Sequence, residues 1–270
     1  DDTMQATMDA RVAMEMGLRD AIANHAFELY YQVQVDQAGT VVGAEALIRW
    51  IGADGKVISP ADFIPLAEET GLIVPMGQWV LDTACQQLAR WQRNPATRHL
   101  TLAVNVSARQ FHQADFVALV HEAIDSTGIH PGELKLELTE SAILGDIEAT
   151  ITKMHQLRDL GLRFALDDFG TGYSSLSYLK RLPFDQLKID QSFTQDMLNN
   201  SASSAIVRAV LVISEALGLE VVAEGVETAA QRAFLISHGC QFCQGYLLGR
   251  PVPIGAWEAA HTTRPDGSTL

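Results

Sequence analysis

The chain has 270 residues, of which 47% are hydrophobic and 19% are charged, a composition typical of a globular protein and not of a disordered one. Its 19 Lys and Arg against 33 Asp and Glu give a formal net charge of −14, which argues against nonspecific binding to a nucleic-acid polymer or an anionic membrane. Cys85, Cys240 and Cys243 are too few for a disulfide scaffold and are typical of a reducing compartment. No stretch approaches the ~18 apolar residues of a membrane helix.

Strand-like and helix-like patterns alternate from residue 27 onward. A first helix is predicted over residues 4–23. Strands are predicted at residues 27–35, 41–49, 100–107, 133–139, 163–168, 186–189, 220–224 and 245–248. Helices are predicted at residues 60–70, 77–93, 110–127, 147–160, 174–179, 202–217, 229–237 and 253–260. Eight strands that alternate with helices over about 250 residues predict an α/β fold of the TIM-type (β/α)8 barrel class.

The connection between the first two predicted strands modifies that barrel. Residues 36–40 are too few for a parallel crossover, so the first strand is expected to run antiparallel to the second. We therefore predict a modified barrel domain over residues 21–262, followed by a flexible tail at 263–270. Residues 1–20 form either a surface helix or a connector from an upstream domain, two compatible interpretations. The apolar residues of this N-terminal segment lie at helical spacing: Met4, Met8, Val12 and Met16.

Carboxylates gather near the ends of the predicted strands, where barrels of this class place their active sites. The set comprises Glu45, Glu137, Asp167, Asp168 and Glu224, with the amide of Asn105 beside them. Five carboxylates in one small volume would raise one another's pKa unless cations neutralise them. An all-oxygen donor set favours Mg²⁺ or Mn²⁺ over zinc.

Each of these acids, taken alone, has a simpler interpretation as a helix cap or a solvated charge at the rim. Asp167 could be a turn residue before Gly170, and Glu140 could cap the helix that follows it. That interpretation does not explain five acids near successive strand ends beside apolar runs. A metal cluster is therefore the favoured hypothesis.

Several longer blocks of residues follow one another in a defined order between residues 20 and 260. They are Glu45-Ala46-Leu47, Asp62-Phe63-Ile64-Pro65, Ala67-Glu68-Glu69-Thr70-Gly71, Asn105-Val106-Ser107, Glu137-Leu138-Thr139-Glu140-Ser141, Asp167-Asp168-Phe169-Gly170-Thr171-Gly172-Tyr173-Ser174-Ser175, Leu187-Lys188-Ile189-Asp190, Ala223-Glu224-Gly225-Val226-Glu227 and Gln244-Gly245-Tyr246. With these blocks in this order, the chain resembles the EAL family of cyclic di-GMP phosphodiesterase domains.

The resemblance implies a reaction and a metal site. The family's fold is a barrel with an antiparallel first strand, and its reaction is hydrolysis of cyclic di-GMP to linear pGpG by in-line attack of water. Two Mg²⁺ or Mn²⁺ ions support this reaction, and Ca²⁺ inhibits it. Carried over by motif position, the ligands of the first metal are Glu45, Asn105, Glu137 and Asp167. Those of the second are Asp167, Asp168 and Glu224, with Asp167 bridging.

The same resemblance implies roles for further residues. Lys188 is similar to the family's lysine that orients the attacking water, and Glu227 and Gln244 are expected to hold ligands or water beside Glu224. The expected substrate contacts are Gln32, Leu47, Arg49 and Asp190. The loop expected to position the aspartates and to couple to dimerisation, with Glu140 bracing it, consists of Phe169, Gly170, Thr171, Gly172, Tyr173, Ser174 and Ser175. Without metals, Lys188 would simply be a salt-bridge partner of the acids.

Three functional hypotheses follow. The first is an active cytoplasmic phosphodiesterase, free or as the cytoplasmic part of a membrane-anchored protein, that forms a homodimer and follows an upstream sensor or GGDEF-type domain. The second is a catalytically silent receptor for cyclic di-GMP, and the third is an unrelated barrel enzyme such as a metal-dependent aldolase or an enolase-type lyase. The complete metal-ligand set favours the first, because a pure receptor need not keep it.

Overall fold

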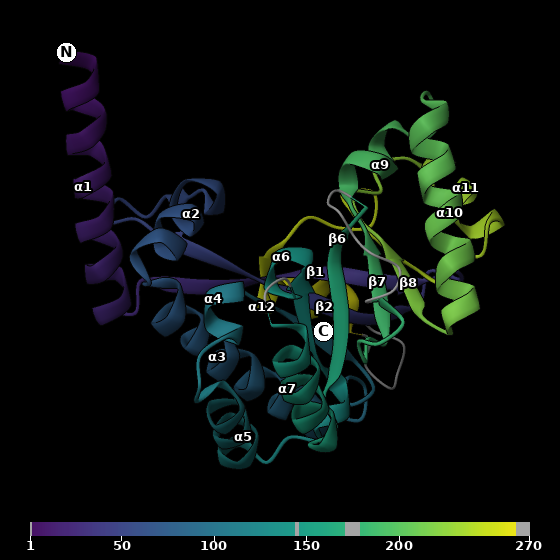
Figure 1. Cartoon of the computed structure of the whole chain (residues 1–270), viewed down its shortest axis with the longest axis horizontal. Helices are drawn as coiled ribbons and strands as arrows, with labels where there is room; N and C mark the ends of the chain where they lie inside the picture. The colour runs from purple at the N-terminus through teal and green to yellow at the C-terminus, as the bar shows by residue number, and fades with distance from the viewer. Residues whose placement is uncertain (1, 144–145, 171–178, 263–270) are drawn as a thin grey trace.

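A closed barrel of strands with helices around it forms the centre of the molecule (Figure 1). The structure, a computed structural model, describes residues 2–143, 146–170 and 179–262. The strands of this described part are β1 (Phe27–Asp36), β2 (Val41–Ile51), β3 (Val57–Ile58), β4 (Thr101–Val106), β5 (Leu134–Thr139), β6 (Arg163–Phe169), β7 (Gln186–Ile189), β8 (Glu220–Ala223), β9 (Phe242–Gln244) and β10 (Val252–Pro253).

The barrel closes because β1 pairs with β2 on one side and with β9 on the other. Around the barrel the described strands follow the order β1, β2, β4, β5, β6, β7, β8, β9. Strand β1 is antiparallel to both neighbours, whereas the successive pairs from β2 to β9 are parallel. The predicted TIM-type barrel with an antiparallel first strand is confirmed.

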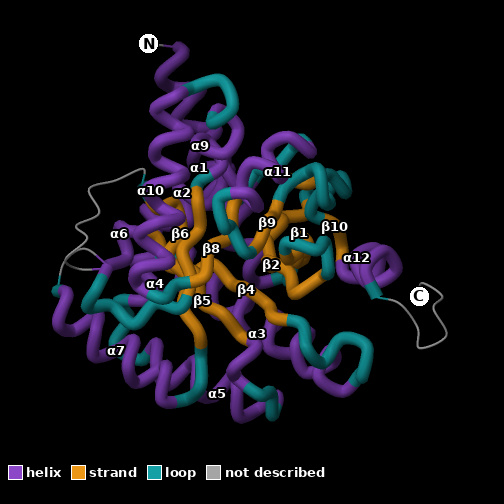
Figure 2. Tube along the Cα trace, turned by 90° about the vertical axis from the view of Figure 1, so that its right-hand side faces the viewer, coloured by secondary structure: helices purple, strands orange, loops and turns teal. Residues whose placement is uncertain are grey.

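Helices cover the outside of the barrel, as the turned view in Figure 2 shows. They are α1 (Asp2–Ala23), α2 (Pro60–Thr70), α3 (Ile73–Arg93), α4 (Ala108–Phe111), α5 (Phe116–Thr127), the 3-10 turn η1 (Pro131–Glu133), α6 (Glu140–Ile143), α7 (Ile147–Asp159), α9 (Gln191–Asp196), α10 (Ser201–Leu217), α11 (Ala229–Ser237) and α12 (Ile254–His261). None of the described helices is both long and apolar enough to span a bilayer. Of the predicted segment 174–179 only Leu179 is described, and the predicted tail 263–270 lies outside the described residues.

Alternation along β5 separates a helix-facing apolar side from a charged side that faces the barrel interior. On β5, Leu134, Leu136 and Leu138 are fully buried in the main hydrophobic cluster. Lys135 and Glu137 alternate with them and contact residues of β7 across the interior. The interior of this barrel therefore carries charged groups, and their placement determines the site.

Among the described side chains of helix α1, those that pack in an apolar cluster lie in its C-terminal half. Leu18 is fully buried in a second apolar cluster that includes Trp50 of β2. The apolar residues that the sequence analysis placed along this helix are exposed at Met8, Val12 and Met16, and Met4 lies outside the described side chains. In Figure 1 the N-terminal part of α1 extends away from the rest of the molecule.

The eighth strand was predicted in the wrong place. Strand β9 covers residues 242–244, whereas 245–248 form a turn in which Leu248 N donates to Gly245 O at 3.0 Å. Gly245 lies directly against the backbone that follows β8, because a Cβ there would be 2.2 Å from Val226 N. This close contact ends the strand at Gln244, and the apolar residues after it belong to the turn.

The predicted helix 110–127 is two helices, α4 and α5. The side chain of Ser107 accepts a hydrogen bond from Gln110 N and so caps α4. Lys153 of α7 donates to the carbonyl oxygens of Phe111 and Gln113, each at 2.7 Å, where α4 ends. These carbonyls thus bind a lysine instead of continuing the helix. Helix α3 begins at residue 73 and not 77, with Pro75 tolerated in its first turn.

Candidate metal and substrate site

One lysine lies at the centre of the predicted acidic cluster. Lys188 of β7 is fully buried, and its Nζ contacts carboxylates from four other strands or strand ends. The distances are 3.4 Å to Glu45 Oε2, 2.5 Å to Glu137 Oε2, 3.3 Å to Asp167 Oδ1 and 2.8 Å to Glu224 Oε1. The structure therefore brings together acids that are up to 179 positions apart in the sequence, as predicted.

The charges of this cluster do not balance. Burial opposes the charge on Lys188, but the surrounding carboxylates outweigh it and hold the pKa of the ammonium well above its usual value. Burial, together with the charge of Glu45, raises the pKa of Glu137, and burial raises that of Glu224 to about 8. One lysine facing four carboxylates leaves an excess of negative charge that further cations would neutralise.

Asp167 and Asp168 present their carboxylates on the same side of β6 although they are adjacent in the chain. Successive residues of a regular strand point to opposite faces. Here the register of β6 against β7 shifts between Leu166 and Phe169, and Asp168 has a φ of 55°. This left-handed residue turns the second carboxylate toward the first, and with Glu224 the three ligand atoms lie within 4.8 Å of one another.

The backbone at Asp168 can be tested separately from its carboxylate. Asp168→Gly and Asp168→Val both remove the carboxylate, so both should lose metal affinity. Only the β-branched valine is strained at positive φ, so we expect Asp168→Val to be less stable than Asp168→Gly by about 1–3 kcal/mol. Urea denaturation of both variants measures the difference; equal stabilities would contradict a left-handed backbone at this residue.

A chain of amides fixes the carboxylate of Glu45. Asn105 Nδ2 donates to Glu45 Oε1 and Gln244 Nε2 donates to Glu45 Oε2, each at 2.6 Å. Gln244 also donates to Gln32 Oε1 at 3.0 Å and accepts from Gln34 Nε2 at 2.8 Å. Burial disfavours the charged form of Glu45, but Lys188 and these amides outweigh it and hold the pKa of Glu45 below its usual value.

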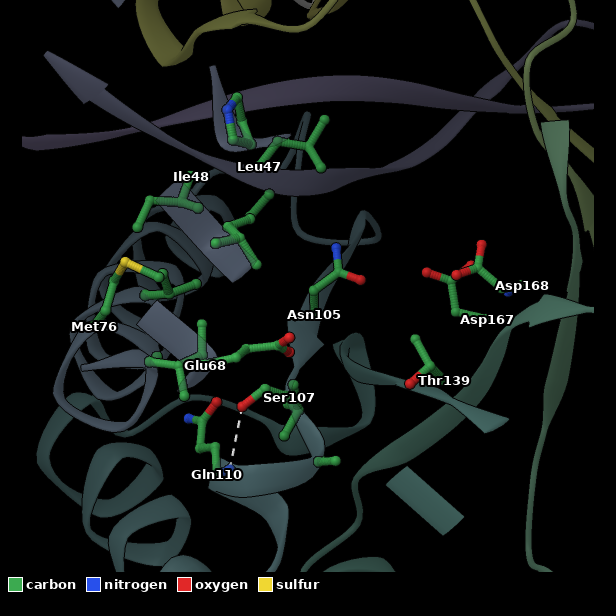
Figure 3. Close-up of a pocket in the computed structure, with 18 of the residues that line it drawn as sticks. Leu47, Ile48, Glu68, Met76, Asn105, Ser107, Gln110, Thr139, Asp167 and Asp168 are labelled. Atoms are coloured by element: carbon green, nitrogen blue, oxygen red, sulfur yellow. Dashed lines mark hydrogen bonds between the residues drawn. The ribbon is translucent and has the colours of Figure 1, made fainter. Parts of the chain in front are cut away.

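Two cavities adjoin the carboxylates. The first, of about 290 Å³, extends from Asn105, Asp167 and Asp168 into an apolar wall that includes Ile48 and Met76 (Figure 3). The second, of about 440 Å³, has polar walls. Its lining residues are Gln32, Glu45, Leu47, Arg49, Gln191, Gln195, Glu224, Gly225, Glu227, Gln244, Gly245, Tyr246 and Pro251. Leu47 and Arg49 line both cavities, so the two flank the end of β2.

The other predicted residues have varied surroundings. Arg49 lies over the ring of Tyr30 at 5.4 Å and donates to the carbonyl of Ile48. Asp190 caps α9 by accepting from Ser192 N at 2.9 Å, and it is absent from the walls of the two cavities. Glu227 Oε1 accepts from Gln195 Nε2 at 3.2 Å at the wall of the second cavity.

The predicted loop is described only where it begins. Phe169 is buried, and Gly170 N donates to Glu140 Oε1 at 3.3 Å, the bracing contact that the resemblance implies. Gly170 has a φ of 99°, which glycine adopts without strain. The remaining predicted loop residues lie outside the described residues: Thr171, Gly172, Tyr173, Ser174 and Ser175. Their assignment to metal positioning and dimerisation stays a prediction.

The donor set fits divalent cations that prefer oxygen. Carboxylates and the Asn105 amide face the region around Lys188, and hard cations such as Mg²⁺ and Mn²⁺ take such ligands. Glu137 Oε1 is buried and makes no hydrogen bond within the described part of the chain. A buried carboxylate oxygen without a partner is costly, and a cation at this position would satisfy it.

The raised carboxyl pKa values predict a pH-dependent stability without metal. Burial raises the pKa of Glu224 to about 8, and burial with the charge of Asp167 raises that of Asp168 to about 6. A carboxyl whose pKa is higher in the folded state contributes stability below its unfolded pKa, and loses that contribution as pH rises through the folded value. In EDTA, the melting temperature should therefore fall between pH 5 and pH 8.5, and Mg²⁺ should reverse most of the fall at high pH. A melting temperature that rises with pH in EDTA would contradict this.

Some residues around the site were not among the predicted ones. Gln34 extends the amide chain of Glu45, and its signal was available, because Gln32 and Gln34 alternate with apolar residues on one strand. Glu68 reaches into the first cavity from helix α2, whereas the prediction considered acids at the ends of strands (Figure 3). Gln191 and Gln195 lie on α9, a helix that was not predicted.

The fold and these strand-end carboxylates define the class of the protein. The family model for the EAL domain matches residues 16–251, and the chain belongs to this family. Among curated relatives, a bifunctional diguanylate cyclase/cyclic di-GMP phosphodiesterase, MucR of Pseudomonas aeruginosa, is 43% identical over 94% of this chain and 37% of its own length. The cyclic di-GMP phosphodiesterase PdeR of Escherichia coli is 39% identical over 91% of this chain and 37% of its own length.

Solved structures agree with this membership. A complex of the MucR phosphodiesterase with c-di-GMP has a TM-score of 0.88 and 43% identity, and the match covers 91% of this chain and 99% of that one. The EAL domain of DcpA from Mycobacterium smegmatis has a TM-score of 0.74 and 38% identity, covering 91% and 99% respectively. This chain spans about a third of the length of the curated relatives it matches.

Proposed function

We propose that this domain hydrolyses cyclic di-GMP to linear pGpG with the help of two Mg²⁺ or Mn²⁺ ions. The observation that carries the proposal is the convergence of Glu45, Glu137, Asp167 and Glu224 on the Nζ of one buried lysine. Family membership and the names of MucR and PdeR support the choice of substrate.

The ligand sets would be those that the motifs imply. Glu45, Asn105, Glu137 and Asp167 would hold one ion, and Asp167, Asp168 and Glu224 the other. When bound, the ions would lower the pKa of a water molecule and offset charge on the phosphate. Asp167 is placed to belong to both sets, since its carboxylate lies with Asp168 and Glu224 and also contacts Lys188.

The chain's own residues would bind and orient the reactants. Lys188 remains protonated because of its carboxylates and would donate a hydrogen bond to the attacking water. The water oxygen would bond to phosphorus and release one proton while the bond to the 3′ oxygen breaks, and the leaving 3′ oxygen would take up one proton, so that the proton count balances. Arg49, which lines both cavities, would contact a phosphate oxygen. The remaining proposed contacts are Gln32, Leu47 and Asp190 for substrate, and Glu227 and Gln244 for ligands or water.

The two cavities suit a cyclic dinucleotide, in which two bases project from one ring of sugars and phosphates. They flank Leu47 and Arg49, so a ligand centred on the carboxylates could extend into both. The first has an apolar wall, including Ile48 and Met76, that suits the face of a base. Its polar groups near that wall, Glu68 and Gln110, could hydrogen-bond a base edge.

The test is direct. Purified protein is incubated with cyclic di-GMP and Mg²⁺, Mn²⁺ or Ca²⁺, and pGpG is measured by chromatography. We expect pGpG with Mg²⁺ or Mn²⁺, and none with Ca²⁺ or EDTA. Binding of cyclic di-GMP without turnover in any metal would refute hydrolysis and support the silent receptor. A different barrel enzyme would show no thermal protection by cyclic di-GMP.

We further propose that the domain acts as a homodimer within a larger signalling protein that carries an upstream sensor or GGDEF-type domain. The Glu140–Gly170 contact supports the first part, because it would connect a dimer-coupled loop to the adjacent aspartates. The length of the relatives supports the proposed larger protein, because this chain covers only 37% of the length of MucR and of PdeR. Specific activity measured across protein concentrations, together with light scattering, tests the dimer: activity per chain that is constant down to the monomer would refute the coupling.

A further inference from the structure

A separate cavity of about 180 Å³, with both polar and apolar walls, lies at the other end of the barrel. Its lining residues are Gln34, Val42, His99, Thr101, Lys135, Arg163, Gln186, Glu220 and Phe242. Thr101, Arg163, Gln186 and Glu220 are the first residues of β4, β6, β7 and β8. Because the carboxylates of the candidate site follow the opposite ends of these parallel strands, this cavity is separate from that site, with Gln34 between the two.

The cavity contains a buried ammonium group with only a neutral partner. Lys135 is 3% exposed, and its Nζ donates to Gln186 Oε1 at 2.8 Å. Within the described part of the chain, no carboxylate oxygen lies within 4.0 Å of this nitrogen, the distance limit for an ion pair. An ammonium has three N–H donors, so two remain for a ligand. Burial of a charge is costly unless an opposite charge or hydrogen bonds compensate it.

The acid that lines this cavity already has partners. Glu220 Oε2 accepts from Arg163 Nη2 at 2.8 Å and from Gln186 Nε2 at 3.3 Å. Lys135 and Arg163 against Glu220 leave a formal charge of +1 on the lining. A locally positive, partly enclosed cavity is unexpected in a chain with a net charge of −14. Its free donors and its charge both call for an anion.

We propose that this cavity binds a small oxyanion of the phosphate class, either free phosphate or the phosphate group of a small monoester. Lys135 supplies the buried charge and two hydrogen-bond donors, and His99, which is exposed, lies at the rim. The volume is several times the ≈ 30 Å³ of a water molecule, and the apolar walls of Val42 and Phe242 limit the hydration of a bound ion. This site is independent of the proposed hydrolysis.

Calorimetric titration at pH 7 in EDTA tests the proposal, because without metal the carboxylate site repels phosphate. One arm uses inorganic phosphate and the other glycerol 3-phosphate, at matched ionic strength. We expect saturable binding in at least one arm, weakened about tenfold or more in Lys135→Met. Lys56→Met is the matched control, since Lys56 is 84% exposed and outside the cavity; it should bind as the unsubstituted protein does.

A second measurement covers the case in which Lys135→Met fails to fold. In the unsubstituted protein, the NMR signals of the His99 ring and the Thr101 amide should shift on titration, with the affinity seen by calorimetry. If glycerol 3-phosphate binds more tightly, the ligand belongs to the class of phosphate monoesters. If inorganic phosphate binds more tightly, the ligand is the free ion. Absence of saturable binding up to about 50 mM in both arms, or equal affinity in Lys135→Met, would overturn the proposal, and Lys135 would then be a structural element of the barrel interior.

Discussion

Replacing Glu45 by glutamine is expected to slow hydrolysis of cyclic di-GMP sharply while leaving nucleotide binding within about tenfold of the unsubstituted protein. The substitution keeps the shape of the side chain and removes one charge from the proposed ligand set. Loss of about 3–5 kcal/mol of transition-state stabilisation would lower kcat/KM by about 10²–10⁴-fold. Binding should survive because the walls of both cavities are unchanged apart from this carboxylate.

Glu69→Gln is the matched control for this variant. Glu69 lies on α2, where it pairs with Arg11, and its side chain is 57% exposed. It should retain full activity. Pre-steady-state pGpG formation and equilibrium binding of cyclic di-GMP in Ca²⁺ separate turnover from affinity. If Glu45→Gln turned over at the rate of the control, the assignment of Glu45 as a metal ligand would be wrong.

Of the variants proposed for the candidate site, Lys188→Met should lower the free energy of unfolding the most. The lysine faces four carboxylates, and its removal leaves buried negative charges without a partner, which costs about 3–5 kcal/mol. The loss should be greater at pH 8 in EDTA, where more of the carboxyls are ionised, than at pH 5, where those with raised pKa are protonated. Mg²⁺ should restore part of the stability, because it replaces the missing charge.

Chemical denaturation at the two pH values, with and without Mg²⁺, measures this effect. Lys56→Met serves as the control, with an expected change within about 0.5 kcal/mol because its side chain is 84% exposed. With metal bound and the fold intact, Lys188→Met should still be about 10²–10⁴-fold less active, since the proposed donor to the attacking water is absent. Equal stability of Lys188→Met and Lys56→Met at pH 8 would show that the carboxylates do not depend on this lysine.

The barrel could be predicted because several of its strands are near-continuous apolar runs, and their order follows from alternation with helices. Antiparallel β1 followed from the length of a single loop. The eighth strand was misplaced because β9 has only three residues, while the apolar run that follows it belongs to a turn held against Val226. Short strands are thus defined by contacts with residues distant in the chain, which periodicity does not report.

The candidate site was predictable in its charged members and less so in their surroundings. Acids at strand ends are visible as interruptions of apolar runs, and Lys188 is visible in the same way. The left-handed backbone at Asp168 and the breaks that create α4 and α9 depend on tertiary contacts. Glu68 reaches the first cavity from α2, and Gln195 reaches the second from α9. Which face of a helix meets a cavity depends on tertiary packing, so the sequence alone did not assign these two residues.

The closure of the barrel by β1 has a consequence for biosynthesis. Gln34 meets Gln244, and Gln32 meets Gly249, across separations of 210 and 217 residues. A chain that emerges from the ribosome therefore makes its first strand early and must wait for almost the whole domain before that strand gains its second neighbour. Until then Glu45 lacks the amide of Gln244 that orients it. The candidate metal site consequently matures last, and a truncated translation product should be inactive even when most of its helices have formed.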